Sequence, residues 1–399
     1  MKKIISSLII IIPFLILIFV PTILYLTAGE NTEDTLDEKR ETENFPIDFD
    51  NDYFVKIEKW YKDNAPYRMT IITKQKEISQ TYGIEYRNII HPKLSAALSP
   101  AWYDDPYRER TGLEGVSFLA PIEDSSVFYG RNNWLFYTGD NSIGYFEGTN
   151  LLSDEEMQVR SDLFLQLYNV CQKKGIQLVY LTGPNKEQMY TEKMPSYYIA
   201  NLPKREELFA NYLIEKGVPY IYPLNKLSSY KDQYAVYYQQ DTHWNEVGAY
   251  LAVMEVYKQL GLPVTPIEDI EVNIKEKKGG DLSDFCGYST TYTDYSVVYK
   301  PDINYSVESI FEGNVDIFNS DNGNNRNMVI IGDSFRNACK TYFAKDFKNT
   351  VVLHRGKINE EIVIQSLQNL KAGDVLLILA VERYDNSHVD VTKRLLEIL

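Results

Sequence analysis

The feature of this sequence that most constrains its fold is a recurring unit in which an amphipathic helix ends in a glycine and a short apolar run follows at once. It occurs in CQKKGIQLVYLTG, YLIEKGVPYIYPL and NLKAGDVLLILAV. A glycine just past a helix supplies the left-handed conformation that ends it, and short apolar runs are typical of strands buried on both faces. The unit predicts an α/β fold with a mainly parallel sheet and helices on both faces.

Further segments extend this pattern. The apolar runs NMVIIGD and TVVLHR flank a predicted helix over residues 335–347. Ser153 and Glu156 form an S-x-x-E capping box at the start of the first long helix. In SVFYGRNNWLFYTGD, two aromatic runs flank a small polar segment, which predicts a β-hairpin at the entry to the main domain.

The N-terminus reads as a membrane anchor. After MKK, residues 4–28 contain no charged side chain, and this span is longer than the roughly 20 apolar residues that a membrane crossing needs. We expect an uncleaved transmembrane helix, with a cleaved signal peptide as the alternative. Lysines precede the span and acidic residues follow it, so the body of the protein is expected outside the cytoplasm, in a single-pass arrangement.

The rest of the chain divides by composition. Residues 1–28 are expected to form a cytoplasmic stub and anchor, and the polar residues 29–50 a flexible linker. Residues 51–125 are expected to form a juxtamembrane helical or irregular segment, because helical spacing there is interrupted. Residues 126–399 are expected to form the catalytic domain, with an irregular insertion of loops and short strands at about 263–326.

Charge and cysteine content exclude several classes of protein. A formal net charge of −15 argues against nucleic acid as a partner. Cys171, Cys286 and Cys339 have neither the number nor the spacing of a disulfide framework or a structural zinc site, although a single disulfide stays open. We expect Cys339 to be a buried apolar residue and not a second nucleophile. The 32 tyrosines suit sugar stacking, or serve as ordinary surface and strand residues.

Three polar clusters follow predicted strands or precede predicted helices, where α/β proteins gather their sites. They are GDSF with Ser334, DTHW with Asp241 and His243, and GPNK with Asn185. Each has an ordinary alternative, because these residue types also cap helices and form turns. Together they supply the nucleophile, base, orienting carboxylate and oxyanion donor that one acyl-transfer site requires.

The chain also resembles the SGNH-like extracytoplasmic O-acetyltransferases of the alginate acetylation type. The resemblance spans roughly residues 45–383 and rests on an ordered set of motifs: EKWYKDNAPYR, GRNNWLFY, LSDEEM, GPNKEQMY, DTHWNEVGA and IGDSF. In this family the Asp-x-His pair precedes the serine, the reverse of the order in ordinary SGNH esterases. The present sequence has that reversed order.

The resemblance implies that Ser334 is the nucleophile, His243 its base and Asp241 the group that orients the imidazole. A serine hydroxyl needs a neighbouring base to become a good nucleophile, which supports this assignment. Candidates for oxyanion or substrate binding are Asn185, Lys186, Arg355 and the backbone N–H of Ser334, and Trp244 is a candidate for sugar stacking, with core packing as its alternative.

The other histidines fit the site less well. His91 and His388 lie outside the clusters and are expected on the surface. His354 ends a predicted strand and could replace His243 as the base, or join Asp241 and His243 in a metal site. Capping and triad roles explain these residues without a metal, so neither a metal nor a cofactor is expected.

These features predict a membrane-anchored, extracytoplasmic enzyme that acetylates a polysaccharide hydroxyl through a serine acyl-enzyme. A domain outside the cytoplasm cannot reach cytosolic acetyl-CoA. The resemblance therefore implies a polytopic membrane-bound O-acyltransferase as the acetyl donor and an extracellular polysaccharide as the acceptor. An acetyl-esterase using the same residues, and a non-catalytic glycan-binding or scaffold module, are the alternatives.

Overall fold

The computed structural model describes residue 56 and residues 127–399, apart from 195–197, 199, 287–288 and 322–323. The expected anchor, linker and juxtamembrane segment therefore lie outside the described residues, with the exception of Lys56. No helix in the described part of the chain is long and apolar enough to cross a membrane.

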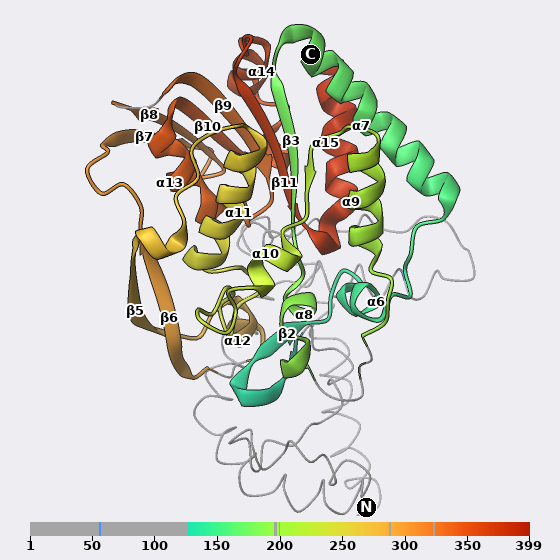
Figure 1. The fold of residues 1–399 in the computed structure, drawn as a ribbon, viewed down its shortest axis with the longest axis vertical. Coiled ribbons are helices and arrows are strands. Elements are labelled where there is room, and N and C mark those ends of the chain that lie inside the picture. Colours follow the sequence, from blue (N-terminus) through green and yellow to red (C-terminus); the bar gives the residue numbers. More distant parts are fainter. Residues whose placement is uncertain (1–55, 57–126, 195–197, 199, 287–288, 322–323) are drawn as a thin grey trace, which may run out of the picture. The chain divides into compact units, whose positions relative to one another are not determined.

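A seven-stranded sheet forms the centre of the described part, in the order β4-β3-β11-β9-β10-β8-β7 (Figure 1). The strands from β4 to β10 in that order are parallel, and β8 and β7 extend the sheet antiparallel, as expected for a mainly parallel sheet. The strands are β3 (Gln177–Gly183), β4 (Tyr220–Ile221), β7 (Tyr305–Ile310), β8 (Val315–Ser320), β9 (Asn324–Gly332), β10 (Phe347–His354) and β11 (Val375–Val381).

Helices cover both faces of this sheet (Figure 1). Alternate side chains of β11 show the two layers: Leu377 and Leu379 pack in the core that contains α11 and α13, whereas Leu376 and Ile378 pack in the core that contains α7, α9 and α15. A strand covered on both faces has to be apolar throughout, which explains the unbroken run VLLILAV. The longer helices are α7 (Asp154–Lys174), α9 (Arg205–Glu215), α11 (Glu246–Gln259), α13 (Arg336–Asp346), α14 (Glu361–Gln368) and α15 (Asp385–Ile398), and the shorter ones are α6 (Ser142–Glu147), α8 (Lys186–Met189), α10 (Leu224–Ser228) and α12 (Asp281–Cys286).

The first helix-to-strand unit has the predicted ends. At the start of α7, the Glu156 N–H donates to Ser153 Oγ at 3.2 Å, and the Glu156 carboxylate accepts from the Ser153 N–H at 2.8 Å. At its end, Gly175 has a φ of 70°, a left-handed conformation that glycine adopts without steric cost. The chain then reverses directly into β3.

The predicted hairpin consists of β1 (Val127–Tyr129) and β2 (Leu135–Tyr137), which pair antiparallel. Its turn has Asn132 at a φ of 59° and Asn133 at a φ of 64°. Asparagine tolerates this left-handed region better than most residues, which accounts for the two polar residues between the aromatic runs.

Residues 263–326 are the segment predicted to be an irregular insertion of loops and short strands. They contain an antiparallel ribbon of β5 (Glu271–Lys278) and β6 (Thr291–Val298), the helix α12, and the pair of β7 and β8 that extends the central sheet. Hydropathy alternation is weak here because the inner face of β6 carries Tyr292 and the carboxylate of Asp294, both buried. Asp294 is accommodated by Asn245 Nδ2 at 3.1 Å and Lys275 Nζ at 3.4 Å.

Candidate active site

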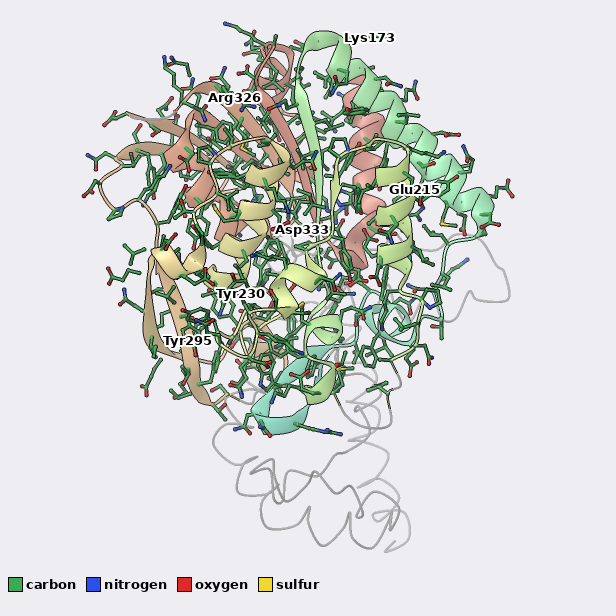
Figure 2. The ribbon with its side chains drawn as sticks, in the orientation of Figure 1. Lys173, Glu215, Tyr230, Tyr295, Arg326 and Asp333 are labelled. Carbon is green, nitrogen blue, oxygen red and sulfur yellow. The ribbon has the colours of Figure 1, made fainter. Side chains whose placement is uncertain are left out.

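The candidate residues meet at the carboxyl edge of the central sheet. Gly183 at the end of β3 pairs with Val381 of β11, and Gly332 at the end of β9 pairs with Leu379 of the same strand. The segments that follow β3, β9 and β11 therefore leave the sheet side by side. Figure 2 labels Asp333, in the turn after β9, near the centre of the view.

The turn that carries Ser334 is fixed by its neighbour, Asp333. One carboxylate oxygen of Asp333 accepts from the Phe335 N–H at 2.9 Å, and the other accepts from the Val381 N–H at 2.7 Å. Asp333 is buried; the first bond closes the turn and the second ties it to β11. Because Asp333 makes these bonds, the turn is held without the hydroxyl of Ser334, which contacts another partner.

His243 and Asp241 lie on a tight reversal of the chain before α11. Tyr237 pairs with Trp244 across this reversal, which keeps the backbone between them non-helical, as expected. The cap of α11 is provided by Asn245, whose side chain accepts from the Gly248 N–H at 3.1 Å. Helix capping therefore does not explain the carboxylate of Asp241.

The structure brings Asp241, His243 and Ser334 into one chain of hydrogen bonds. Nδ1 of His243 lies 2.7 Å from Oδ1 of Asp241, and Nε2 lies 2.6 Å from Oγ of Ser334. The same Asp241 oxygen accepts from the His243 N–H at 3.0 Å, which fixes the carboxylate relative to the ring. His354 instead lies at the end of β10, where its Nδ1 accepts from the Gly356 N–H at 3.3 Å.

The electrostatics of the site favour a charged Asp241 and a basic His243. Burial lowers the pKa of His243, but hydrogen bonds and charge interactions with Asp241 and Asp281 outweigh burial and raise that pKa to about 9. Burial raises the pKa of Asp241, but its bonds to His243 outweigh this effect and hold the pKa well below its usual range. The carboxylate stays ionised and keeps the proton of a neutral imidazole on Nδ1, so that Nε2 can accept from Ser334.

The second carboxylate, Asp281 at the start of α12, was missed in the sequence. Its Oδ2 lies 3.5 Å from Nδ1 of His243. Asp241, His243 and Asp281 could offer three ligand atoms to a metal ion. Their mutual hydrogen bonds account for the arrangement without one.

Asn185 presents a buried amide at the same edge. Its Oδ1 accepts from the Arg383 N–H at 3.2 Å, and because a backbone N–H can only donate, this contact identifies the oxygen of the amide. Nδ2 is buried and has no hydrogen-bond partner among the described residues. A buried N–H group without a partner is costly, so this amide suits a ligand oxygen.

Lys186 has a different environment from the one expected of a substrate-binding residue. It is 2% exposed, and its ammonium donates to the carbonyls of Leu135, Gln239 and Asp241 at 2.7, 2.8 and 3.0 Å. Burial lowers the pKa of Lys186 to about 7, although the charges of Asp241 and Asp281 oppose this shift. Three carbonyl acceptors match the three donors of an ammonium, which favours positioning of the loop over contact with substrate.

Trp244 is fully buried, which fits the core-packing alternative and not the stacking of its ring on a sugar. Its indole Nε1 donates to the carbonyl oxygen of Phe335 at 3.0 Å, and the two rings are 5.0 Å apart. Trp244 thus connects the loop that carries His243 to the turn that carries Ser334 through the core.

Two arginines lie at the same edge. Arg355, half-buried after β10, places its guanidinium 5.5 Å from the centre of the Tyr384 ring. Arg383, which was missed, lies 5.3 Å from the same ring and 5.8 Å from the Phe335 ring. The signal that could have identified Arg383 is its place two residues after the buried run of β11.

Cys339 and His388 lie outside the site. Cys339 is fully buried and burial raises the pKa of its thiol, as expected for an inert apolar residue. The prediction that His388 lies on the surface is wrong: it is 1% exposed on the inner face of α15, with Nε2 2.9 Å from Oγ1 of Thr182. Burial lowers the pKa of His388 to about 4. His91 lies outside the described residues.

Residues 127–354 match the family described as SGNH hydrolase-like domain, acetyltransferase AlgX. PatB1 of Bacillus cereus is 16% identical, with 64% of this chain and 96% of that chain covered and a TM-score of 0.46. The O-acetyltransferase domain of Pseudomonas putida AlgJ is 15% identical, with 68% and 99% covered and a TM-score of 0.41. Pseudomonas aeruginosa AlgX is 17% identical, with 67% and 64% covered and a TM-score of 0.43. No curated protein matches the chain in sequence.

Proposed function

Because the chain belongs to the SGNH hydrolase-like acetyltransferase family, we propose that it transfers an acetyl group through Ser334 to a hydroxyl of an extracellular polysaccharide. The observation that carries the proposal is the 2.6 Å contact between Nε2 of His243 and Oγ of Ser334, with Asp241 on the opposite ring nitrogen. A nucleophile within hydrogen-bond reach of an oriented base is the geometry that acyl transfer requires.

In the first half of the reaction, Oγ of Ser334 attacks the carbonyl carbon of the acetyl donor while His243 Nε2 takes the hydroxyl proton. Asp241 stabilises the imidazolium that forms. The negative charge on the carbonyl oxygen is met by N–H donors, for which Nδ2 of Asn185 and the backbone N–H of Ser334 are the candidates. The tetrahedral intermediate then collapses, the donor's leaving group takes the proton from His243, and the acetyl group stays on Ser334 as an ester.

In the second half, His243 removes the proton of an acceptor hydroxyl, and the resulting oxygen attacks the acetyl-serine carbonyl. The bond to Ser334 breaks, Ser334 Oγ regains the proton, and the acetyl ester is now on the acceptor. If water takes the place of the sugar, the same steps release acetate, so the identical residues support an acetyl-esterase. The identity of the attacking hydroxyl decides between the two activities.

The proposal includes an extracytoplasmic location and a donor protein. The uncharged residues 4–28, with lysines before them and acidic residues after them, support a single-pass anchor with the catalytic domain outside. Acetyl-CoA is cytosolic, so an acetyl group has to be carried across the bilayer. We assign that step to a polytopic membrane-bound O-acyltransferase partner.

The test uses the full chain in detergent with 4-nitrophenyl acetate as donor and a panel of neutral and acidic oligosaccharides as acceptors. We expect acetylated oligosaccharide by mass spectrometry in excess of free acetate, and loss of both products in Ser334→Ala. Ser306→Ala, on the exposed strand β7, is the matched control and should keep full activity.

The other outcomes favour one of the alternative functions or contradict the mechanism. Free acetate without acetylated sugar favours the esterase. Inactivity of the wild-type chain in both measurements favours a glycan-binding or scaffold module. Full activity in Ser334→Ala would eliminate the proposed mechanism.

A further inference from the structure

A second acidic side chain reaches the imidazole of His243 from the insertion between α11 and β9. Oδ2 of Asp281 lies 3.5 Å from Nδ1 of His243, the nitrogen that already has Asp241 at 2.7 Å. Asp281 is held there by Thr242, whose backbone N–H and hydroxyl donate to its two oxygens at 2.7 and 2.6 Å. The carboxylate is therefore aimed at the ring and is not a freely rotating surface group.

The backbone around Asp281 packs closely against the loop that carries Asp241. A methyl group at Gly280 would lie 2.5 Å from Cβ of Asp241 and 2.7 Å from the carbonyl oxygen of Gln240, so only glycine fits. The Asp281 N–H donates to Oδ2 of Asp241 at 3.3 Å, and the Ser283 N–H donates to the Gln240 carbonyl at 3.2 Å. These contacts fix the register of α12 against the loop.

The geometry points to Asp281 as a positioning residue for His243, a second carboxylate that works together with Asp241 on the same imidazole nitrogen. This inference rests on the proposed function for its catalytic consequence. Asp241 makes the short bond that selects the tautomer, while Asp281 holds Thr242 between the two triad residues and adds negative charge beside the ring. Two carboxylates stabilise the imidazolium more than one does, and this cation forms in both halves of the reaction.

Several ionisable groups lie near the His243 ring and influence its pKa. Asp241 and Asp281 face Nδ1, and the ammonium of Lys186 lies behind the loop, bonded to the Asp241 carbonyl. On the opposite side, Asp333 is occupied by backbone N–H groups of its own turn and of β11. Removing the charge of Asp281 should therefore lower the pKa of His243.

The decisive experiment follows the imidazole directly. The full chain in detergent is labelled on histidine, and His243 is assigned among the four histidines by comparison with His243→Ala. NMR titration of Asp281→Asn should show a His243 pKa lower than in the wild type by about 1 unit. Asp284→Asn is the matched control, because it removes the same charge from an exposed position of the same short helix. An unchanged titration in Asp281→Asn, or an equal change in Asp284→Asn, would overturn the inference.

A second measurement addresses catalysis. In Asp281→Asn, the rise of kcat/KM with pH should move to lower pH by about 1 unit, whereas a merely structural role would reduce kcat/KM without moving the rise. In a His243→Ala background, Asp281→Asn should cause no further loss, because Asp281 acts through the imidazole. A further loss there, or a rise that stays at its wild-type pH, would contradict the inference. If turnover is independent of Ser334, the proposed function fails, and the NMR titration still decides the role of Asp281.

Discussion

At the scale of single residues, the protonation of His243 governs the activity that we propose. Burial opposes its charge, but Asp241 and Asp281 raise its pKa to about 9. A general base works in its deprotonated form, and a raised pKa means that the ring is mostly protonated near neutral pH. We therefore expect kcat/KM for 4-nitrophenyl acetate to keep rising to about pH 9. The measurement is initial rates across this range with Ser334→Ala subtracted, and a plateau reached at neutral pH would contradict the expectation.

Replacing Asp241 tests how much the activity depends on the orientation and tautomer of the His243 ring. Asp241→Asn keeps the size of the side chain but favours the wrong tautomer of His243, so kcat should fall by about 100-fold or more. Asp281 remains in place, and for this reason we expect the residual rate to stay above that of Ser334→Ala. The assay is single-turnover acetylation of the protein followed by mass spectrometry. Wild-type kinetics in Asp241→Asn would remove this residue from the mechanism.

At the scale of secondary structure elements, Lys186 of α8 joins this helix to the hairpin and to the loop before α11. Its ammonium bonds the hairpin at Leu135 and the loop at Gln239 and Asp241. Lys186→Met leaves these carbonyls without their donor, and we expect the free energy of unfolding to fall by roughly 3 kcal/mol. Urea denaturation measures the change, with the exposed Lys173→Met as control. Equal stability of the two variants would show that the bonds contribute little.

Helix α15 carries a buried base that should make stability depend on pH. Burial lowers the pKa of His388 from 6.5 to about 4, so the unfolded chain binds a proton in this interval that the folded chain does not. Stability is thus present above pH 6.5 and is lost as the pH falls, by up to about 3 kcal/mol. His388→Gln should flatten the dependence between these two pH values in urea titrations. The same slope in both proteins would show that His388 is not responsible.

The elements that the sequence predicted well are those whose signals are local. A capping box, a terminal glycine and an apolar run define α7 and β3 without reference to the rest of the chain. The three residues of the hydrogen-bonded chain were found because the DTHW and GDSF motifs, in this order, resemble those of a known family. The approach of Asp281 to His243 and the burial of Lys186 and His388 depend on which segments meet in three dimensions, and no local pattern encodes that. The hydropathy of Lys186 alone predicts an exposed side chain, and only three carbonyls from distant segments make its burial tolerable.

At the scale of the whole molecule, we expect membrane attachment and activity to be separable by truncation. Deleting residues 1–28 should move the protein from the membrane fraction to the soluble fraction, because the uncharged span is the segment expected to hold it there. Turnover of 4-nitrophenyl acetate should be unchanged, since the residues of the site all lie beyond residue 184. Immunoblotting of fractions and an activity assay test this together. A truncated protein that still sediments with membranes would show that another segment binds them.

The strand order has a consequence for how the protein is made. β11 lies between β3 and β9 in the interior of the sheet, yet it is the last strand in the chain. A chain emerging from the ribosome therefore has Asp241, His243 and Ser334 long before it has the strand whose Val381 N–H holds the Ser334 turn through Asp333. Until residues 375–381 insert, β3 and β9 expose the edges that β11 will cover, and unpaired edges invite pairing with other chains. The turn of Ser334 can therefore reach its described position only after residues 375–381 have joined the sheet.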